Sequence, residues 1–266
     1  MKHLKHTDTP ILQFSNLLHF QQIIHFSSTR NGGVSENNFR SFNLGSEPSD
    51  SKINRQQNYG ILANATGVEP QAFCLLKQDH GTKIKVIEPG EPAGTDNLFN
   101  GYDALITNAR NKCLVVRTAD CVPLLLFDPE KMVIAAIHAG WRGTVKKIAQ
   151  QTVRLMMEQY GCNPASVQAG IGPSISPEVY EVSSDVYQRF KAETWNCRPV
   201  FRKSAKSGKY LLDLWKANQL QLEEIGVLSG NIEIAGICTF SHPELFFSAR
   251  RDGIESGRMA TGIMLK

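Results

Sequence analysis

The segment from 117 to 144, RTADCVPLLLFDPEKMVIAAIHAGWRGT, constrains the fold of this chain more than any other stretch. Two apolar runs, PLLLF and MVIAAI, flank DPEK, and the proline in DPEK favours a turn, so the pattern predicts a β-hairpin. A buried hairpin needs no polar side chains at its ends. Here Cys121 stands at one end and His138 at the other, with the turn about midway between them. Folding of the hairpin would bring the thiol and the imidazole to the same edge of a sheet.

The bulk properties are those of an ordinary globular chain. Its 266 residues are 41% hydrophobic and 20% charged, which suffices for a sizeable core without disulfides. We find no repeat or linker, and we therefore expect one domain over 1–266, with a flexible N-terminus at 1–10. The net charge of +4 suits anionic substrates. Without a basic run or a basic-aromatic stripe, it argues against nucleic acid as a partner.

The sequence also indicates where the protein works. No apolar stretch approaches the ~20 residues of a membrane span, and the first ten residues lack the features of a signal peptide. The six cysteines form no CxxC pair, which favours reduced thiols. We expect a cytoplasmic protein with no membrane partner. No dimer seam is evident, and a monomer is expected.

The remaining patterns alternate between strands and helices. Strands are expected within 21–30, 82–88, 102–107, 113–118, 166–171 and 231–237, with NARNK as the turn between the third and the fourth. Helices are expected within 49–67, 145–160, 183–193 and 212–226; Ser49 or Asp50 would cap the first and Gly67 would end it. The tail from Cys238 is expected to form short strands and turns. Together these elements predict an α/β protein with mixed sheets covered by helices.

A thiolate and an imidazole side by side, as expected for Cys121 and His138, could form half of a zinc site. A third candidate ligand is His80, in LKQDHGTKI, on a loop or at a strand start. If His80, Cys121 and His138 converge, they offer nitrogen, sulfur and nitrogen donors. Closed structural zinc sites use four protein ligands, whereas three leave a position for water or substrate. The set therefore suggests hydrolytic or transfer chemistry. Copper is also compatible with these donors. The alternative is a buried cysteine beside two structural histidines.

Two further segments carry candidate binding groups. In HAGWRGT the glycines allow close backbone approach, and Arg142 can hold phosphate or carboxylate. Asp120, next to Cys121, could orient His138 or carry a proton. In STRNGGVS, Arg30 precedes two glycines whose backbone N–H groups could bind an anion. The alternative for HAGWRGT is a turn and a helix N-terminus with an arginine on the surface.

Eight motifs, spread from residue 29 to 258, resemble the YfiH family. They are TRNGGVS, FNLG, KQDHG, YDALIT, RTADCVPLLLFDP, AAIHAGWRGT, AGIGPSISPEVYEV and SARRDGIESGR. This family is also described as laccase-domain or multicopper polyphenol oxidase-like proteins, purine nucleoside phosphorylases and peptidoglycan editing factors. The resemblance implies a single-domain α/β/β/α layered fold, with His80, Cys121 and His138 as metal ligands and with Arg30 and Asn43 in the substrate pocket. Asp79 stands where the family usually has an apolar or small residue.

The resemblance further implies a zinc-bearing cytosolic enzyme for purine nucleosides. It would phosphorolyse adenosine, inosine, guanosine or methylthioadenosine to base and ribose 1-phosphate, and would deaminate adenosine. Deamination would use metal-activated water, with Asp120 as proton carrier. Phosphorolysis would use Arg30 and Arg142 to position phosphate.

Four other interpretations compete with this one. Cys121 could act as a nucleophile with His138 as base, in a Cys/His hydrolase. A related editing hydrolase would remove L-serine from a UDP-MurNAc peptidoglycan precursor. Copper-dependent phenol oxidation is disfavoured, because it needs several copper centres and the chain has only seven histidines. A non-enzymatic binding module with a structural metal would need a fourth protein ligand, and the sequence offers no candidate.

Overall fold

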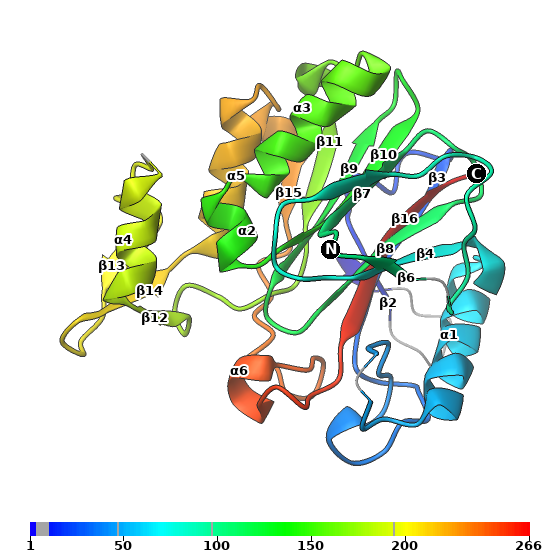
Figure 1. The fold of residues 1–266 in the computed structure, drawn as a ribbon, viewed down its shortest axis with the longest axis horizontal. Helices are drawn as coiled ribbons and strands as arrows, with labels where there is room; N and C mark the ends of the chain where they lie inside the picture. The colour runs from blue at the N-terminus through cyan, green and yellow to red at the C-terminus, as the bar shows by residue number, and fades with distance from the viewer. Residues whose placement is uncertain (4–10, 47, 97, 194) are drawn as a thin grey trace.

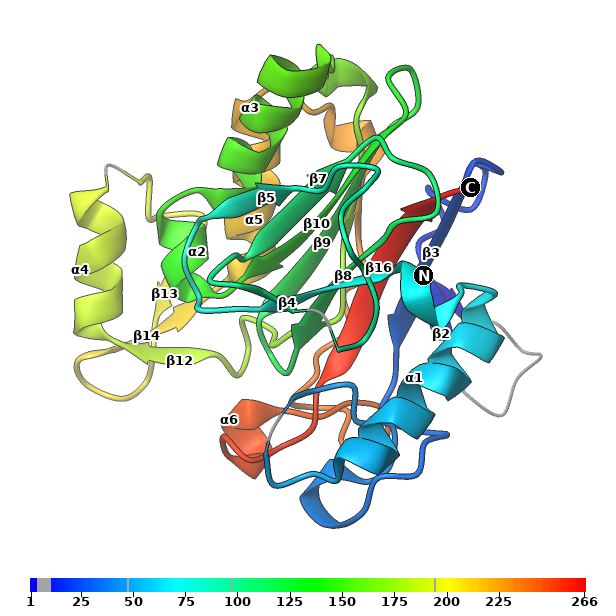
Figure 2. The same ribbon diagram turned by 45° about the vertical axis from the view of Figure 1, so that its right-hand side comes forward.

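The core of the molecule is a pair of β-sheets that pack face to face (Figures 1 and 2). The computed structural model describes residues 1–266 except 4–10, 47, 97 and 194. Between the two sheets lies an apolar cluster to which both inner faces contribute. Most of the segment 1–10, predicted to be a flexible N-terminus, lies outside the described residues. Within it, Lys2 and His3 pair with Gln13 and Leu12.

Three sheets are present in the described part of the chain. The order in the seven-stranded sheet is β1 (Lys2–His3), β2 (Ile11–Gln13), β3 (Ile23–Ser28), β16 (Met259–Leu265), β8 (Cys113–Thr118), β4 (Phe73–Lys77) and β6 (Leu98–Asn100). The order in the six-stranded sheet is β15 (Ile232–Ile234), β11 (Gln168–Ile171), β9 (Val122–Asp128), β10 (Val133–Ala139), β7 (Ala104–Thr107) and β5 (Ile84–Val86). A small sheet contains β12 (Glu181–Ser183), β14 (Lys209–Leu212) and β13 (Phe201–Lys203).

Helices cover the outer faces of the two large sheets. The apolar face of α1 (Lys52–Thr66) packs on the seven-stranded sheet. On the six-stranded sheet lie α3 (Ile148–Tyr160) and α5 (Leu214–Glu224), with α2 (Trp141–Val145) beside them (Figure 1). The layers are therefore α/β/β/α, with parallel and antiparallel pairings in both sheets, as predicted. Beyond this stack, α4 (Ser184–Ala192) and the small sheet form a lobe.

The predicted hairpin is confirmed and lies at the centre of the six-stranded sheet. Strands β9 and β10 pair antiparallel from Val133 opposite Asp128 to Ala139 opposite Val122. Every residue of both strands is buried, because one face packs on the other sheet and the second face packs under helices. The start of β9, next to Cys121, and the end of β10, at His138, therefore lie side by side where these two central strands leave the sheet.

Four local expectations need correction. Ser51 caps α1, because its side chain accepts a hydrogen bond from the Asn54 amide, whereas Ser49 and Asp50 were the predicted caps. Strands β7 and β8 lie in different sheets, so NARNK crosses between sheets and is not a hairpin turn. The helix expected over 145–160 is divided at Lys147, whose φ of 61° interrupts the helical hydrogen bonds. The tail contains a helix, α6 (Ala249–Asp252), and the fully buried strand β16 inside the large sheet.

Gly67 ends α1 as predicted, with a left-handed φ of 71°. Among the described residues, no helix is both long enough and apolar enough to cross a membrane.

The buried imidazole of His25 predicts a loss of stability in acid. Its Nε2 accepts a hydrogen bond from the Phe14 amide, and burial lowers its pKa from 6.5 to about 4. Below pH 6.5 the unfolded chain therefore binds a proton that the folded chain does not, so stability falls as the pH drops and levels off near pH 4. The total loss is about 3 kcal/mol. Urea unfolding at about pH 7 and about pH 4, with a metal chelator present, measures this loss of stability. In His25→Gln the loss should be smaller by that amount; an equal loss in both proteins would contradict the assignment.

Candidate metal centre

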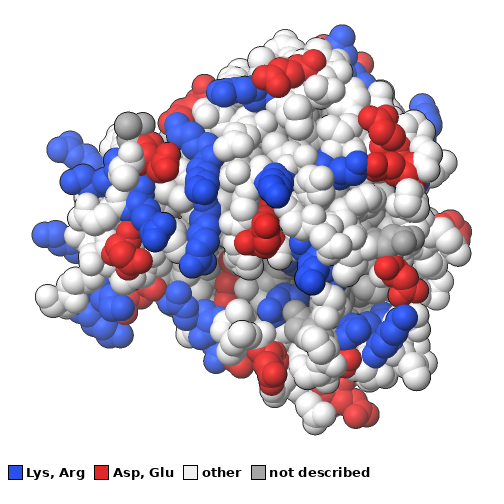
Figure 3. Space-filling view, viewed as in Figure 1, with Lys and Arg blue, Asp and Glu red and all other residues white. Residues whose placement is uncertain are grey.

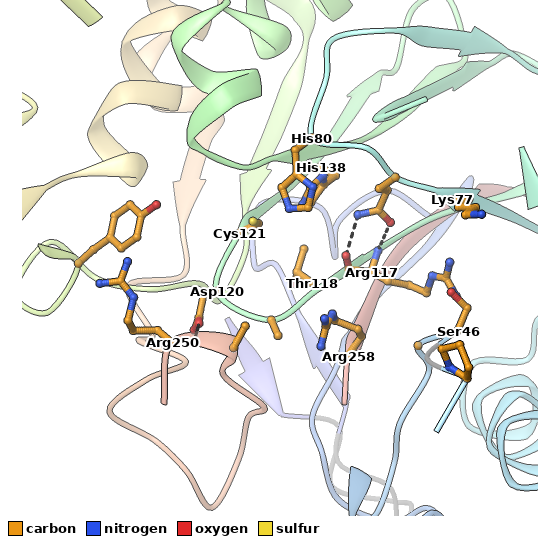
Figure 4. Close-up of a pocket in the computed structure, with 16 residues that line it drawn as sticks. Ser46, Lys77, His80, Arg117, Thr118, Asp120, Cys121, His138, Arg250 and Arg258 are labelled. Atoms are coloured by element: carbon orange, nitrogen blue, oxygen red, sulfur yellow. Dashed lines mark hydrogen bonds between the residues drawn. The ribbon is translucent and has the colours of Figure 1, made fainter. Parts of the chain in front are cut away.

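Three elements bring His80, Cys121 and His138 together. Cys121 directly precedes β9, and His138 lies near the end of β10, opposite Pro123. His80 lies on the loop after β4 and has a positive φ of 62°, which is uncommon for a residue with a side chain. The possible ligand atoms of the three residues lie within 4.8 Å of one another, and the two imidazole rings stand nearly perpendicular (Figure 4). The three residues singled out by sequence thus form one cluster.

Asp103, just before β7, holds two of these residues in place. Its Oδ1 accepts hydrogen bonds from His138 Nδ1 at 2.7 Å and from the His80 backbone amide at 3.0 Å, and its Oδ2 accepts one from the Gly81 amide at 2.6 Å. Because a carboxylate only accepts, His138 donates through Nδ1 and keeps Nε2 for a metal. The partner of His138 is therefore Asp103. This corrects the suggestion that Asp120 orients His138.

The cluster also favours a thiolate at Cys121. Burial alone would raise the pKa of the thiol, but the charge of His138 and hydrogen bonds from His138 and His80 outweigh burial and lower it below its usual value. Burial would lower the pKa of His138, but the Cys121 charge and the Asp103 hydrogen bond raise it. The thiolate is the form of cysteine that ligates metals.

The absence of a side chain at Gly140 leaves room for the side chains of His80 and Cys121. A Cβ at this position would lie 3.0 Å from His80 Cδ2 and 3.1 Å from Cys121 Sγ, closer than ordinary contacts. Gly143 has a similar role, since a Cβ there would lie 2.9 Å from the Gly81 carbonyl oxygen. The two glycines of HAGWRGT thus leave room for neighbouring protein atoms, whereas the predicted approach of their backbone to a ligand stays a prediction.

We expect Gly140→Ala to weaken metal binding about 10- to 100-fold, because overpacking of a tight site costs about 1–3 kcal/mol. Competition with a chromogenic chelator measures this change. The matched control is Gly60→Ala, in the middle of α1, where no atom beyond the neighbouring residues and the helix's own backbone lies within 4 Å of the added Cβ. The control should leave metal affinity unchanged and should stabilise the helix slightly. Equal metal affinities in the two variants would contradict this role of Gly140.

These residues fit a single transition-metal ion. Two imidazoles and a thiolate form a donor set used for zinc, and metal–ligand distances of about 2.0–2.3 Å require the close grouping seen here. Among the described residues, this is the one group of three or more His, Cys, Asp or Glu placed to hold a metal. The structure therefore contains a candidate metal centre with three protein ligands.

The candidate centre forms one wall of a cavity of about 600 Å³ (Figure 4). Four cationic side chains line the cavity, against one carboxylate, Asp120, among the described lining residues; the cations are Lys77, Arg117, Arg250 and Arg258. Figure 4 shows Lys77, Arg117 and Arg258 across the cavity from Cys121. Tyr180 adds an aromatic wall, with the Arg250 guanidinium over its ring at 5.0 Å. The lining suits an anionic ligand with a planar group.

Asp120 lines this cavity but has several protein partners. Its Oδ1 accepts a hydrogen bond from Thr239 Oγ1, and its Oδ2 accepts hydrogen bonds from Ser248 Oγ and the Arg250 amide. These contacts anchor α6, and with it the side of the cavity that carries Arg250. The position of Asp120 next to Cys121 keeps a proton-carrying role as a prediction.

The structure does not place the other predicted binding residues in this cavity. The Arg30 guanidinium donates to the carbonyl oxygens of Arg40 and Pro243 and lies in a separate groove. The Asn43 side chain is buried, and its oxygen accepts hydrogen bonds from the amides of Gly45 and Arg258, two residues that line the cavity. Arg142 lines a neighbouring cavity that shares His80. Their predicted contacts with substrate stay predictions.

Sequence reasoning missed Asp103 and the four cations of the cavity. A signal for Asp103 was available, because an aspartate directly before a wholly buried strand needs a polar partner. Arg117, Arg250 and Arg258 lie in RTADC and SARRDGIESGR, two motifs that were noted without a role for their arginines.

The fold and the site together define a class of protein: a layered α/β protein with a candidate metal centre at the ends of two central strands and a cationic cavity beside it. A family model described as multi-copper polyphenol oxidoreductase laccase matches residues 24–266. The YfiH protein of Bacillus licheniformis has a similar structure, with a TM-score of 0.91, 30% identity and 99% coverage of both chains.

Two relatives with enzyme names are similar over almost their whole length. A purine nucleoside phosphorylase of Bacteroides thetaiotaomicron is 38% identical over 97% of both chains. Adenosine deaminase RL5 from an unknown prokaryotic organism is 35% identical over 91% of this chain and 93% of its own. The chain belongs to the laccase-domain family, the family that includes YfiH.

Proposed function

We propose that the protein is a zinc-dependent purine nucleoside enzyme. It would phosphorolyse adenosine, inosine, guanosine or methylthioadenosine to base and ribose 1-phosphate, and it would deaminate adenosine to inosine. The observation that carries the proposal is the opening of the His80–Cys121–His138 cluster onto a cationic cavity of about 600 Å³. This volume is within the about 300–1,000 Å³ of small-molecule sites. The names of the two relatives, a purine nucleoside phosphorylase and an adenosine deaminase, support purine nucleosides as the substrate class.

His80, Cys121 and His138 would hold the metal, and Asp103 would keep His138 in the ligating tautomer. When bound there, zinc supplies Lewis acidity that activates water near neutral pH. In deamination, water adds at C6 of adenine and ammonia leaves. Asp120, which borders both Cys121 and the cavity, is the proposed proton carrier.

In phosphorolysis, a phosphate oxygen bonds to C1′ of the ribose while the C1′–N9 bond breaks and its electron pair goes to the base, which takes up a proton. The protein must then hold a phosphate anion beside the sugar. Lys77 and Arg250, on different sides of the cavity, supply positive charge for this purpose. Tyr180 offers a flat surface against which a purine can stack.

Product analysis tests the proposal. Metal-loaded protein with adenosine should give adenine and ribose 1-phosphate only when phosphate is present, whereas inosine should form with or without phosphate. Failure to consume any of the four nucleosides, with the metal in place, would contradict the proposal.

One observation favours a second candidate. The thiolate-favouring contact between Cys121 and His138 also suits a Cys/His hydrolase, and the cationic lining suits an anionic substrate such as a UDP-MurNAc peptide carrying L-serine. Metal content separates the candidates, because a nucleophilic thiolate needs no metal. Copper-dependent polyphenol oxidation is less favoured, since the described residues offer one three-ligand cluster and multicopper chemistry needs several centres.

A further inference from the structure

A second cavity, of about 340 Å³, adjoins the candidate metal centre between α2 and α4. His80 lines both this cavity and the larger one, so the two cavities share a wall at the candidate centre. The other lining residues come from α2, from α4 of the protruding lobe and from the residue that follows each helix; they are Trp141, Arg142, Val145, Lys146, Arg189, Ala192 and Glu193. The family resemblance predicts that Arg142 positions the phosphate of phosphorolysis, but the proposed reaction takes this charge from Lys77 and Arg250 of the larger cavity and leaves the second cavity without a role.

The charges in this second cavity are unbalanced. Arg142, Lys146 and Arg189 face one carboxylate, Glu193, among the described lining residues. In the part of the chain that the structure describes, none of these three cations has a carboxylate within 4.0 Å. Asp185, one turn before Arg189 on α4, lies beyond that distance. Figure 3 shows basic side chains in a column along the boundary between the α4 lobe and the body of the molecule.

Both guanidinium groups of this cavity lie over the indole ring of Trp141. The Arg142 guanidinium carbon lies 4.6 Å from the ring centre, and that of Arg189 lies 5.9 Å from it. Stacking on an aromatic ring orders a guanidinium group but leaves its N–H donors and its charge available to a ligand. Two ordered guanidinium forks and one ammonium group, in a cavity, form a receptor for a tetrahedral oxyanion.

We propose that the cavity between α2 and α4 binds a phosphoryl group, at a site separate from the cationic cavity on the other side of His80. Arg142 and Arg189 donate hydrogen bonds to its oxygens, and Lys146 adds charge. The phosphoryl group belongs either to free phosphate or to a phosphorylated ligand. This inference goes beyond the proposed nucleoside reaction and does not depend on it, because binding needs no turnover.

Titration of tryptophan fluorescence with inorganic phosphate tests the site, with chloride added to keep the ionic strength constant. Wild-type protein should give a saturable change that Trp141→Phe abolishes, and calorimetry on the same samples should give the same affinity. Arg189→Gln should weaken phosphate binding about tenfold or more, because charge-assisted hydrogen bonds are lost. Arg189 is exposed, so this variant should fold normally.

The matched control is Lys191→Gln, which removes the same charge from an exposed position of α4 outside the cavity. It should bind phosphate as the wild type does. A parallel titration with adenosine 5′-monophosphate identifies the source: tighter binding than phosphate indicates a phosphorylated ligand, and equal binding indicates free phosphate. Three results would overturn the proposal: no saturable binding at about millimolar phosphate, an unchanged response in Trp141→Phe, or equal weakening in Arg189→Gln and Lys191→Gln.

Discussion

His138→Ala is expected to lose metal binding and both nucleoside activities. The substitution removes one of three ligands, and it leaves the buried Asp103 carboxylate without its imidazole partner. Loss of the hydrogen-bond partner of a metal ligand lowers metal affinity about 10- to 100-fold. Loss of the ligand itself should lower metal affinity by more than this. Metal content by mass spectrometry, together with nucleoside turnover, measures the effect.

Two further variants make this result interpretable. His19→Ala removes an exposed imidazole outside the cluster and should keep full metal content and activity. Cys121→Ser removes a different ligand and keeps the polar partners of His138, so it guards against a folding defect in His138→Ala. Full activity in a folded, metal-free form of either cluster variant would remove the metal from the mechanism.

Asp103→Asn should have the next largest effect. The amide keeps the shape of the side chain but loses its charge. Because Asp103 accepts from both His138 Nδ1 and the backbone amides of His80 and Gly81, an NH₂ group must face at least one N–H donor. We expect metal affinity and turnover to fall about 10- to 100-fold.

Asp79→Asn is the matched control for Asp103. The Asp79 carboxylate is exposed, accepts a hydrogen bond from the same Gly81 amide and lies within hydrogen-bonding reach of the Asp103 carboxyl group, a contact that asparagine can keep, but it has no hydrogen bond to either imidazole ring. Its replacement should change metal affinity by less than about threefold, as expected for an exposed group. Equal losses in the two variants would show that loop charge, and not ligand positioning, is the important property.

Local patterns predicted the part of the centre that depends on local pairing. The turn near 128–131 sets the register of β9 and β10, and this register places Cys121 beside His138. Asp103 could not be placed in this way. It reaches His138 because β7 pairs with β10, with Ala104 opposite Ile137, and strands so far apart in sequence leave no local signal of their register.

The same limit applies to the tail and to the cavity. Residues 259–265 contain a glycine within a short apolar run, which gives little evidence of a central strand, yet β16 lies between β3 and β8. That strand and α6 bring Arg258 and Arg250 to the cavity from the far end of the sequence. Arg30 was predicted to bind substrate but hydrogen-bonds to the protein itself. Its partners, the carbonyl oxygens of Arg40 and Pro243, come close to it only in the folded chain.

The central claim is that one metal ion at His80, Cys121 and His138 supports nucleoside chemistry. The most direct test measures metal per chain and adenosine turnover on the same purified sample, before chelation, after chelation and after reloading with zinc. The account predicts about one zinc per chain, loss of turnover with the metal and recovery on reloading. Undiminished turnover by the chelated, metal-free protein would contradict it and would make Cys121 the nucleophile.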